Sequence, residues 1–171
     1  MKKLLCILAL AVVGCGREWT AASPGEQGAR ALLVCLNMPT EEAEPAAQAV
    51  EVWNHALGGW RGLTPSVGGR SDCDVTVDVV DTKETWCGHT SELGGNHVVL
   101  NSTCLKDTYA IVMHELGHVF GAQHAPNTLM APTLSGMYSW AGSGTLCPDK
   151  TTIAQVAAYQ RISLTTLSWC Y

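Results

Sequence analysis

The chain has 171 residues, a length that fits a single domain. Its composition, 47% hydrophobic and 15% charged, is that of a globular protein and excludes an intrinsically disordered chain. The formal net charge is −5 and no run of Lys and Arg follows the first residues, which argues against nucleic acid or an anionic membrane surface as a partner.

The N-terminus is typical of an export signal. Two lysines precede a ten-residue apolar stretch, Leu4 to Val13, which is too short to span a bilayer. The stretch leads into Val-Val-Gly-Cys at residues 12–15, which resembles a bacterial lipobox. This resemblance implies a lipoprotein signal peptide over residues 1–14 and a lipid on Cys15. The alternative is an ordinary signal peptide with an incidental cysteine.

Residues 15–30 are polar and contain a proline and several glycines, so we interpret them as the lipid anchor and a tether. The rest of the chain, residues 31–171, forms the one predicted domain. It begins with a short apolar run, residues 31–37, which suits a buried strand.

Apolar residues at helical spacing then predict a helix from an N-cap at Thr40 to Leu57, where two glycines end it. Its core side consists of Ala46, Ala49, Val50, Trp53 and Leu57. Acidic residues in the first turn suit a helix N-terminus, and we prefer this interpretation to a calcium site. These residues are Glu41, Glu42 and Glu44.

Several strands are predicted to follow. Residues 60–69 form a loop with room for a short strand, and valines that recur with a period of two predict a strand over residues 75–80. Shorter strands are predicted over residues 86–90 and 97–101, with a glycine turn between them.

Asp107 is an N-cap candidate for a helix over residues 108–120. Residues 125–144 are rich in Gly and Ser and are predicted to be irregular. Asp149 then caps a last helix over residues 151–162. The core side of the helix predicted over residues 108–120 would consist of Val112, Leu116, Val119 and Phe120.

The cysteine count is consistent with export. Of eight cysteines, one leaves with the signal peptide and Cys15 is assigned to the lipid, so an even number remains. None of them forms a C-x-x-C pair, which disfavours a metal site and favours three disulfides in an oxidising compartment. Several connectivities are possible; with one bridge around a hairpin and one across the last helix, we expect Cys87–Cys104, Cys147–Cys170 and Cys35–Cys73.

The most informative segment begins at residue 114 and reads H-E-x-x-H-x-x-G-x-x-H. On a helix, His114 and His118 lie on one face and can bind one ion together. Gly121 can end the helix with a positive φ, so that the chain returns to offer His124 as a third ligand. Glu115 faces the same cleft and is placed as a general base. Three histidines leave a fourth zinc position for water, which is the catalytic arrangement.

A short H-E-x-x-H string also occurs as two surface histidines on ordinary helices, but the extended string is too specific for that interpretation. It resembles the motif of the metzincin metallopeptidases, in which a Met-turn follows. Met130 in Leu-Met-Ala-Pro at residues 129–132 supplies such a turn, and Met-x-Pro resembles the matrixin branch. Ala125 departs from this branch, which usually has serine there.

The resemblance covers residues 31–171 and implies an α+β fold. This fold has a twisted mixed sheet, an active-site helix, an irregular lower subdomain and a C-terminal helix. It also implies that the strand near residues 86–90 is the edge strand that borders the cleft, where an extended peptide can add to the sheet. One catalytic zinc is expected. Matrixins also carry a structural zinc and calcium, whose ligands cannot be identified in this sequence.

Two groups of residues can be interpreted either as part of a functional site or as ordinary surface or core residues. His89 and His97 are either remnants of the structural zinc site or surface histidines, and we prefer the latter. Four tryptophans either line a substrate groove or pack against the core, and we prefer packing for each of them. They are Trp60, Trp86, Trp140 and Trp169.

The sequence therefore predicts a monomeric zinc endopeptidase that hydrolyses peptide bonds of proteins, with Glu115 as general base on zinc-bound water. We expect it in the bacterial cell envelope, at the outer membrane or cell surface, attached only by its N-terminal lipid. The alternative is a catalytically silent lipoprotein of the same fold that binds zinc or a protein partner. The presence of Glu115 beside a complete set of ligands favours the enzyme.

Overall fold

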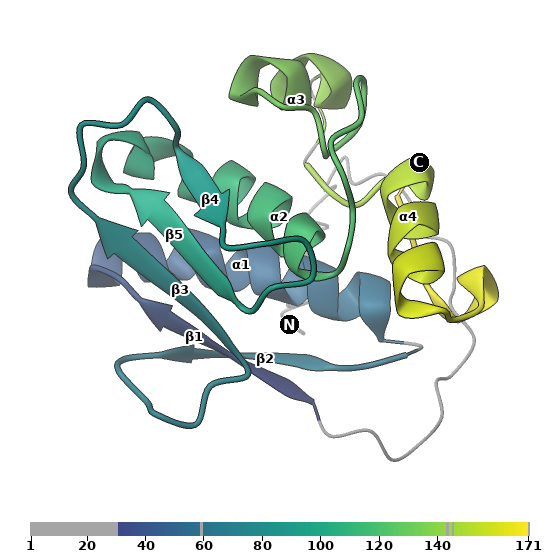
Figure 1. The fold of residues 1–171 in the computed structure, drawn as a ribbon, viewed down its shortest axis with the longest axis horizontal. Helices are drawn as coiled ribbons and strands as arrows, with labels where there is room; N and C mark the ends of the chain where they lie inside the picture. Colours follow the sequence, from purple (N-terminus) through teal and green to yellow (C-terminus); the bar gives the residue numbers. More distant parts are fainter. Residues whose placement is uncertain (1–30, 59, 143, 145, 171) are drawn as a thin grey trace, which may run out of the picture.

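The computed structural model describes residues 31–171 apart from residues 59, 143, 145 and 171. A five-stranded mixed sheet has two of the four α-helices behind it, and the other two lie beside it (Figure 1). The strands are β1 (Leu32–Asn37), β2 (Leu63–Val67), β3 (Val75–Val80), β4 (Gly88–Thr90) and β5 (His97–Asn101). The α-helices are α1 (Thr40–Leu57), α2 (Thr108–Val119), α3 (Leu134–Ala141) and α4 (Lys150–Gln160), and two 3-10 helices, η1 and η2, span Ser102–Asp107 and Leu164–Thr166.

The strand order β2-β1-β3-β5-β4 makes β4 one edge of the sheet. β4 pairs antiparallel with β5, whereas the other three pairs are parallel. Parallel strands need a crossover, and α1 supplies the one between β1 and β2. The chain thus has the expected α+β architecture, with the short strand of residues 88–90 at an edge.

Helices α1 and α2 pack on one face of the sheet and enclose the core. Trp53 of α1 is fully buried, and its ring lies 5.2 Å from that of Phe120, measured between centroids. Its Nε1 donates a 2.9 Å hydrogen bond to the Met113 carbonyl of α2, so the indole satisfies its polar atom while it fills the core. The predicted core sides of both helices are confirmed, since Ala46, Ala49, Val50, Leu57, Val112, Leu116 and Val119 are all buried.

The remaining helices differ in part from the predictions. Asp149 caps α4 as predicted, by accepting a 3.0 Å hydrogen bond from the Thr152 backbone N–H. Asp107 occupies the N-cap position of α2 as predicted, whereas Thr40 is the first residue of α1 and not its N-cap. The residue before α1 is Pro39, and neither it nor Asp107 caps through its side chain. The stretch predicted to be irregular contains α3, whose first turn is capped by the Thr133 hydroxyl.

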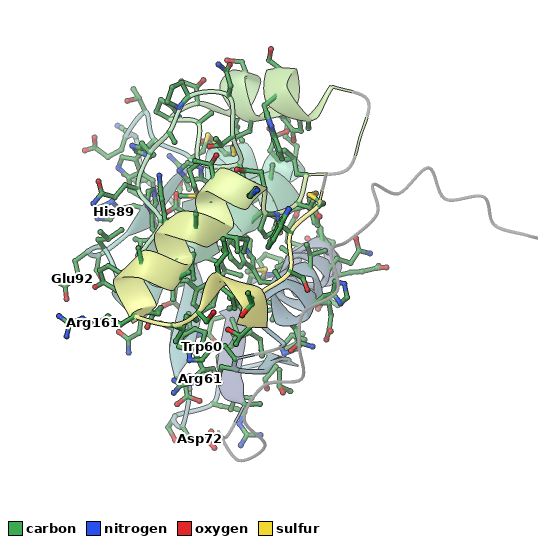
Figure 2. All side chains as sticks on the ribbon, turned by 90° about the vertical axis from the view of Figure 1, so that its right-hand side faces the viewer. Trp60, Arg61, Asp72, His89, Glu92 and Arg161 are labelled. Atoms are coloured by element: carbon green, nitrogen blue, oxygen red, sulfur yellow. A yellow bond between two sulfur atoms is a disulfide. The ribbon has the colours of Figure 1, made fainter. Side chains whose placement is uncertain are left out.

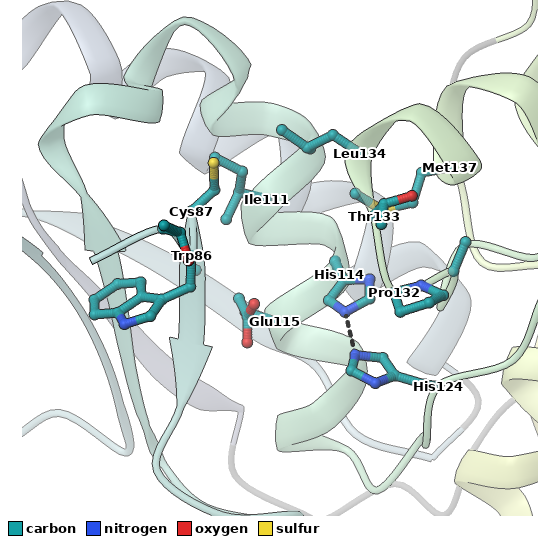
Figure 3. Close-up of a pocket in the computed structure, with 13 residues that line it drawn as sticks. Trp86, Cys87, Ile111, His114, Glu115, His124, Pro132, Thr133, Leu134 and Met137 are labelled. Atoms are coloured by element: carbon teal, nitrogen blue, oxygen red, sulfur yellow. Dashed lines mark hydrogen bonds between the residues drawn. The ribbon is translucent and has the colours of Figure 1, made fainter. Parts of the chain in front are cut away.

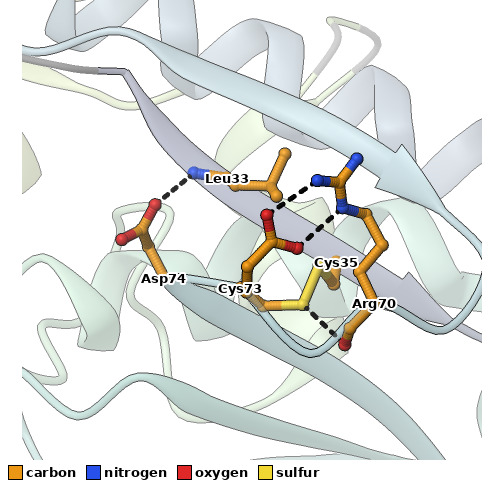
Figure 4. Close-up of polar contacts among 6 residues, drawn as sticks. Leu33, Cys35, Arg70, Cys73 and Asp74 are labelled. Carbon is orange, nitrogen blue, oxygen red and sulfur yellow. Dashed lines mark hydrogen bonds and ion pairs between the residues drawn. A yellow bond between two sulfur atoms is a disulfide. The ribbon is translucent and has the colours of Figure 1, made fainter.

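Three disulfides join the pairs that were predicted: Cys35–Cys73, Cys87–Cys104 and Cys147–Cys170. The first holds the loop before β3 against β1 (Figure 4). Beside it, Asp74 accepts a 2.7 Å hydrogen bond from the Leu33 backbone N–H and donates its own N–H to the Leu33 carbonyl. These two bonds tie β1 to the residue just before β3. Three disulfides in one domain are typical of proteins outside the cytoplasm.

The predicted signal peptide, the lipidated Cys15 and the tether all lie outside the described residues. In the part of the chain that is described, no helix has both the length and the apolar character needed to cross a membrane.

Replacing Cys35 and Cys73 together by alanine should lower the free energy of unfolding by about 2–4 kcal/mol, because the bridge closes a long loop in the unfolded chain. Urea unfolding under oxidising conditions measures this. Cys73 adjoins Asp72, which lies at the lower end of the molecule in Figure 2, away from His89 of β4. Zinc affinity should therefore stay unchanged, and a variant as stable as the parent would contradict the stabilising role.

Candidate metal centre and cleft

The three predicted histidine ligands come together at one point. The Nε2 atoms lie 3.1 Å apart for His114 and His118, 3.2 Å apart for His114 and His124, and 3.2 Å apart for His118 and His124. His114 is buried, His118 is half-buried and His124 is exposed, so the group opens to solvent on one side. Within the described ranges, this is the one cluster of His, Cys, Asp or Glu side chains that could hold a metal ion.

Backbone carbonyls fix which nitrogens of two histidines carry hydrogen. Nδ1 of His114 lies 3.1 Å from the Leu129 carbonyl oxygen, and Nδ1 of His118 lies 2.8 Å from that of Ala122. A carbonyl can only accept, so each Nδ1 donates and each Nε2 directs a lone pair at the shared point. Two lone pairs that face each other at 3.1 Å repel, and this arrangement suits a cation between them.

The spacing fits zinc. Zinc–nitrogen bonds of about 2.0–2.1 Å at tetrahedral angles place ligand nitrogens about 3.3–3.4 Å apart. The three observed separations, 3.1–3.2 Å, are within a few tenths of an ångström of this value. Neutral imidazoles on three corners leave one tetrahedral corner without a protein ligand from this group.

Burial favours the neutral form, which a metal requires, for two of these imidazoles, those of His114 and His118. Desolvation lowers the pKa of His114 to about 4, and repulsion from the neighbouring His118 and His124 acts in the same direction. Desolvation also lowers the pKa of His118. The proton is therefore a weak competitor for these two ligands above mildly acidic pH.

The end of α2 turns the chain so that it can present His124. Gly121 has φ +98°, a conformation that glycine adopts at low cost, and the Ala122 N–H donates to the Gly117 carbonyl. A Cβ at Gly121 would also lie 2.1 Å from Cγ of Tyr159 in α4. Glycine is thus required at residue 121 both by the backbone and by the packing of the C-terminal helix.

Met130 forms an apolar layer beneath α2. Its side chain is fully buried, and a Cβ placed on Gly117 would lie 2.3 Å from its sulfur. Gly117 stands between two of the ligand positions, so its missing side chain allows the methionine to reach the helix backbone. The predicted Met-turn therefore lies against the helix that carries the ligands.

A buried chain of hydrogen bonds connects α4 to the first ligand. Asp149, which caps α4, also accepts a 2.9 Å hydrogen bond from the Leu129 backbone N–H. The carbonyl of Leu129 is the group that binds Nδ1 of His114. Asp149 thus holds the peptide that orients the imidazole, a role beyond the capping role that was predicted.

Glu115 lies next to the histidines and is 5% exposed. Burial raises the pKa of its carboxyl group to about 7, although hydrogen bonds from the Thr90 hydroxyl and backbone oppose this shift. A carboxyl group with a pKa close to neutral is suited to accept and then release a proton.

Two adjoining hollows form a cleft on both sides of this carboxylate, and Gly88, Glu115 and His124 contribute to both. The first hollow is mainly apolar (Figure 3), and its walls include Trp86, Ile111, Leu134 and Met137. The second is more polar and includes His89, Glu92, His118 and Gln123. His89 and Glu92 project at the molecular surface (Figure 2).

The other candidate residues are not part of the metal centre. His97 pairs with Asp78 at 2.8 Å, and the exposed His89 lies near the Trp86 ring, so neither joins a further metal cluster among the described residues. Glu41 and Glu42 lie in the first turn of α1. Of the four tryptophans, Trp86 lines the cleft, contrary to the preferred interpretation, whereas Trp60, Trp140 and Trp169 pack against the core.

Two residues near Glu115 were not predicted to act at the site. Gly88 and Thr90 were seen only as members of a short strand, yet both face α2. The alternation of side chains along a strand could have shown that residues 88 and 90 share one face and that His89 lies on the other. That this face meets Glu115 could not be foreseen without the tertiary structure.

Two comparisons with known proteins find no match: neither a protein-family model nor a curated protein matches this chain. The interpretation of the site therefore depends on its geometry.

The purified protein should bind one zinc ion per chain, and His124→Ala should weaken binding by about 100-fold or more. Loss of an outer hydrogen-bond partner alone costs about 10–100-fold, and loss of a ligand should cost at least as much. Competition with a fluorescent chelator measures the affinity. His97→Ala is the matched control and should bind as the parent does, whereas parental affinity in His124→Ala would exclude this residue as a ligand.

Glu115 should make the metal-free protein less stable as the pH rises. Its pKa is about 7 when folded and 4.5 ordinarily, so the folded state holds more protons between these values and loses stability as pH increases through them. The free energy of unfolding of metal-free Glu115→Gln should therefore rise relative to that of the parent as the pH increases through this window. Above pH ~7 this relative gain should be on the order of 3 kcal/mol. Urea unfolding at pH 5 and pH 8 checks this, and an equal difference at both values would contradict it.

Proposed function

We propose that the protein is a zinc-dependent endopeptidase of the metzincin type, with a matrixin-like Met-turn. The observation that carries the proposal is the position of Glu115: a buried carboxylate beside three converging imidazoles, in a cleft open on both sides. A site that only stores zinc has no use for a base at this place. His114, His118 and His124 would hold the ion, and Met130 lies beneath them.

When bound, zinc lowers the pKa of a coordinated water toward ~7 and polarises the carbonyl of the bond to be cleaved. Glu115 accepts the proton of the attacking water and then donates it to the leaving amine, which cannot depart as an anion. Burial raises the pKa of this carboxyl group in the metal-free protein, which favours the protonated form that the second step requires.

β4 supports the proposal that the substrate is a polypeptide. It is the edge strand of the sheet and contributes Gly88 to both hollows of the cleft. An edge strand offers backbone N–H and C=O groups to which an extended peptide can bind as a further strand. A cleft that continues past the base on both sides accepts residues before and after the cleaved bond, as an endopeptidase requires.

We also propose that the enzyme works outside the cytoplasm as a lipid-anchored protein. Three disulfides support export. The anchor itself depends on Cys15 and the lipobox-like residues before it. Incorporation of labelled fatty acid into the parent but not into Cys15→Ser would support this assignment, and equal labelling would contradict it.

Glu115→Gln should abolish peptide cleavage while zinc binding is preserved. Loss of general acid–base catalysis should lower kcat by about 10²–10⁴-fold, because the amide has the shape of the carboxylate but cannot accept the proton. Cleavage of an internally quenched peptide library by parent and variant measures this, with zinc content determined in parallel. A chelator should stop the parent reaction and added zinc should restore it.

Two results would overturn the proposal. Parental cleavage by Glu115→Gln would remove the carboxylate from the mechanism. Absence of cleavage by folded protein that carries one zinc per chain would favour a silent binding protein with this fold.

A further inference from the structure

Thr90 of β4 makes a direct contact with the candidate base. Its hydroxyl donates a 2.7 Å hydrogen bond to Oε2 of Glu115 and lies 3.2 Å from the Glu115 carbonyl oxygen. Thr90 is 8% exposed and Glu115 5% exposed, so solvent competes little for this bond. Hydrogen bonds to a charged group in such surroundings are stronger than those at the surface.

Gly88 makes room for the other carboxylate oxygen. A Cβ at Gly88 would lie 2.6 Å from Oε1 of Glu115 and 2.4 Å from Cγ2 of Ile111. Residues 88 and 90 share one face of β4, so this strand leaves space for one carboxylate oxygen and binds the other. The rotation of the carboxylate about its last bond is thereby restricted.

A carboxylate without this bond would have several orientations available, because terminal torsions of glutamate have broad minima. A base is effective only when its oxygen stays within hydrogen-bond distance of the proton that it takes. The Thr90 bond engages Oε2, whereas Oε1 lies beside Gly88, which lines both hollows of the cleft.

We propose that Thr90 is a positioning residue that holds the Glu115 carboxylate in its reactive orientation. This inference rests on the proposed function of Glu115. It also gives β4 two tasks, since the strand whose edge would bind the peptide is the strand that orients the base. The same three residues, those of β4, would thus position both the substrate and the base.

The experiment compares Thr90→Val, which keeps the shape but removes the hydroxyl, with Thr90→Ser, which keeps the hydroxyl. Thr108→Val is the matched control. Thr108 is also buried and also donates to a glutamate, with 2.9 Å between its Oγ1 and Oε2 of Glu42, but neither residue lines the cleft. All variants are loaded with zinc and assayed on one quenched peptide, and their crystal structures are determined.

We expect kcat of Thr90→Val to fall about 10- to 100-fold while KM stays within about twofold, because the freed carboxylate spends less time in the orientation from which it can take the proton. Thr90→Ser and Thr108→Val should keep the parental kcat. In the Thr90→Val crystal, the Glu115 side chain should occupy more than one rotamer. A purely structural role would lower stability alike in both valine variants and leave kcat unchanged.

The crystal structure separates this inference from the proposed function. If the parent protein cleaves no peptide, the proposed function fails, but a Glu115 side chain that is ordered in the parent and disordered in Thr90→Val still supports positioning. Parental kcat in Thr90→Val, or an unchanged Glu115 rotamer there, overturns the inference.

Discussion

Three imidazole nitrogens lie 3.1–3.2 Å from one another, and at least two of them direct lone pairs at the same point. This arrangement is repulsive unless a cation lies between them, so the rest of the fold must hold it in place. Two ligands come from one helix turn and need only the geometry of α2. The third requires the chain to reverse within three residues, which depends on Gly121.

The surrounding layers act on this centre from three directions. Below α2, Met130 packs against Gly117, and Trp53 of α1 donates to the Met113 carbonyl. From α4, Asp149 fixes the Leu129 peptide that orients His114. From the sheet, β4 brings Thr90 against Glu115. The disulfide between Cys87 and Cys104 ties the chain just before β4 to the segment that leads into α2. Three of these supports, from Trp53, Asp149 and Thr90, also satisfy buried polar groups, so loss of any of these hydrogen bonds should disturb the site.

Most of the fold and the three converging histidines could be predicted from the sequence because their signals are local. His114 and His118 are separated by one helix turn, and the periods of two and 3.6 residues identify the strands and the core sides of α1 and α2. Helix α3 could not be predicted, since its composition resembles a loop and its stability depends on the cap from Thr133. Asp107 has the character of an N-cap, but its carboxylate accepts from Tyr138 instead. The contacts of Thr90 and Asp149 join residues about 20 or more positions apart, and no local pattern records them.

The measurement that tests the account most directly is the zinc K-edge X-ray absorption spectrum of the zinc-loaded protein. The account predicts four light ligands at about 2.0–2.1 Å, three of them with the multiple scattering of imidazole and the fourth an oxygen from water. The spectrum of His124→Ala should show one imidazole fewer. A sulfur ligand at about 2.3 Å, or fewer than three imidazoles in the parent, would contradict an open three-histidine centre.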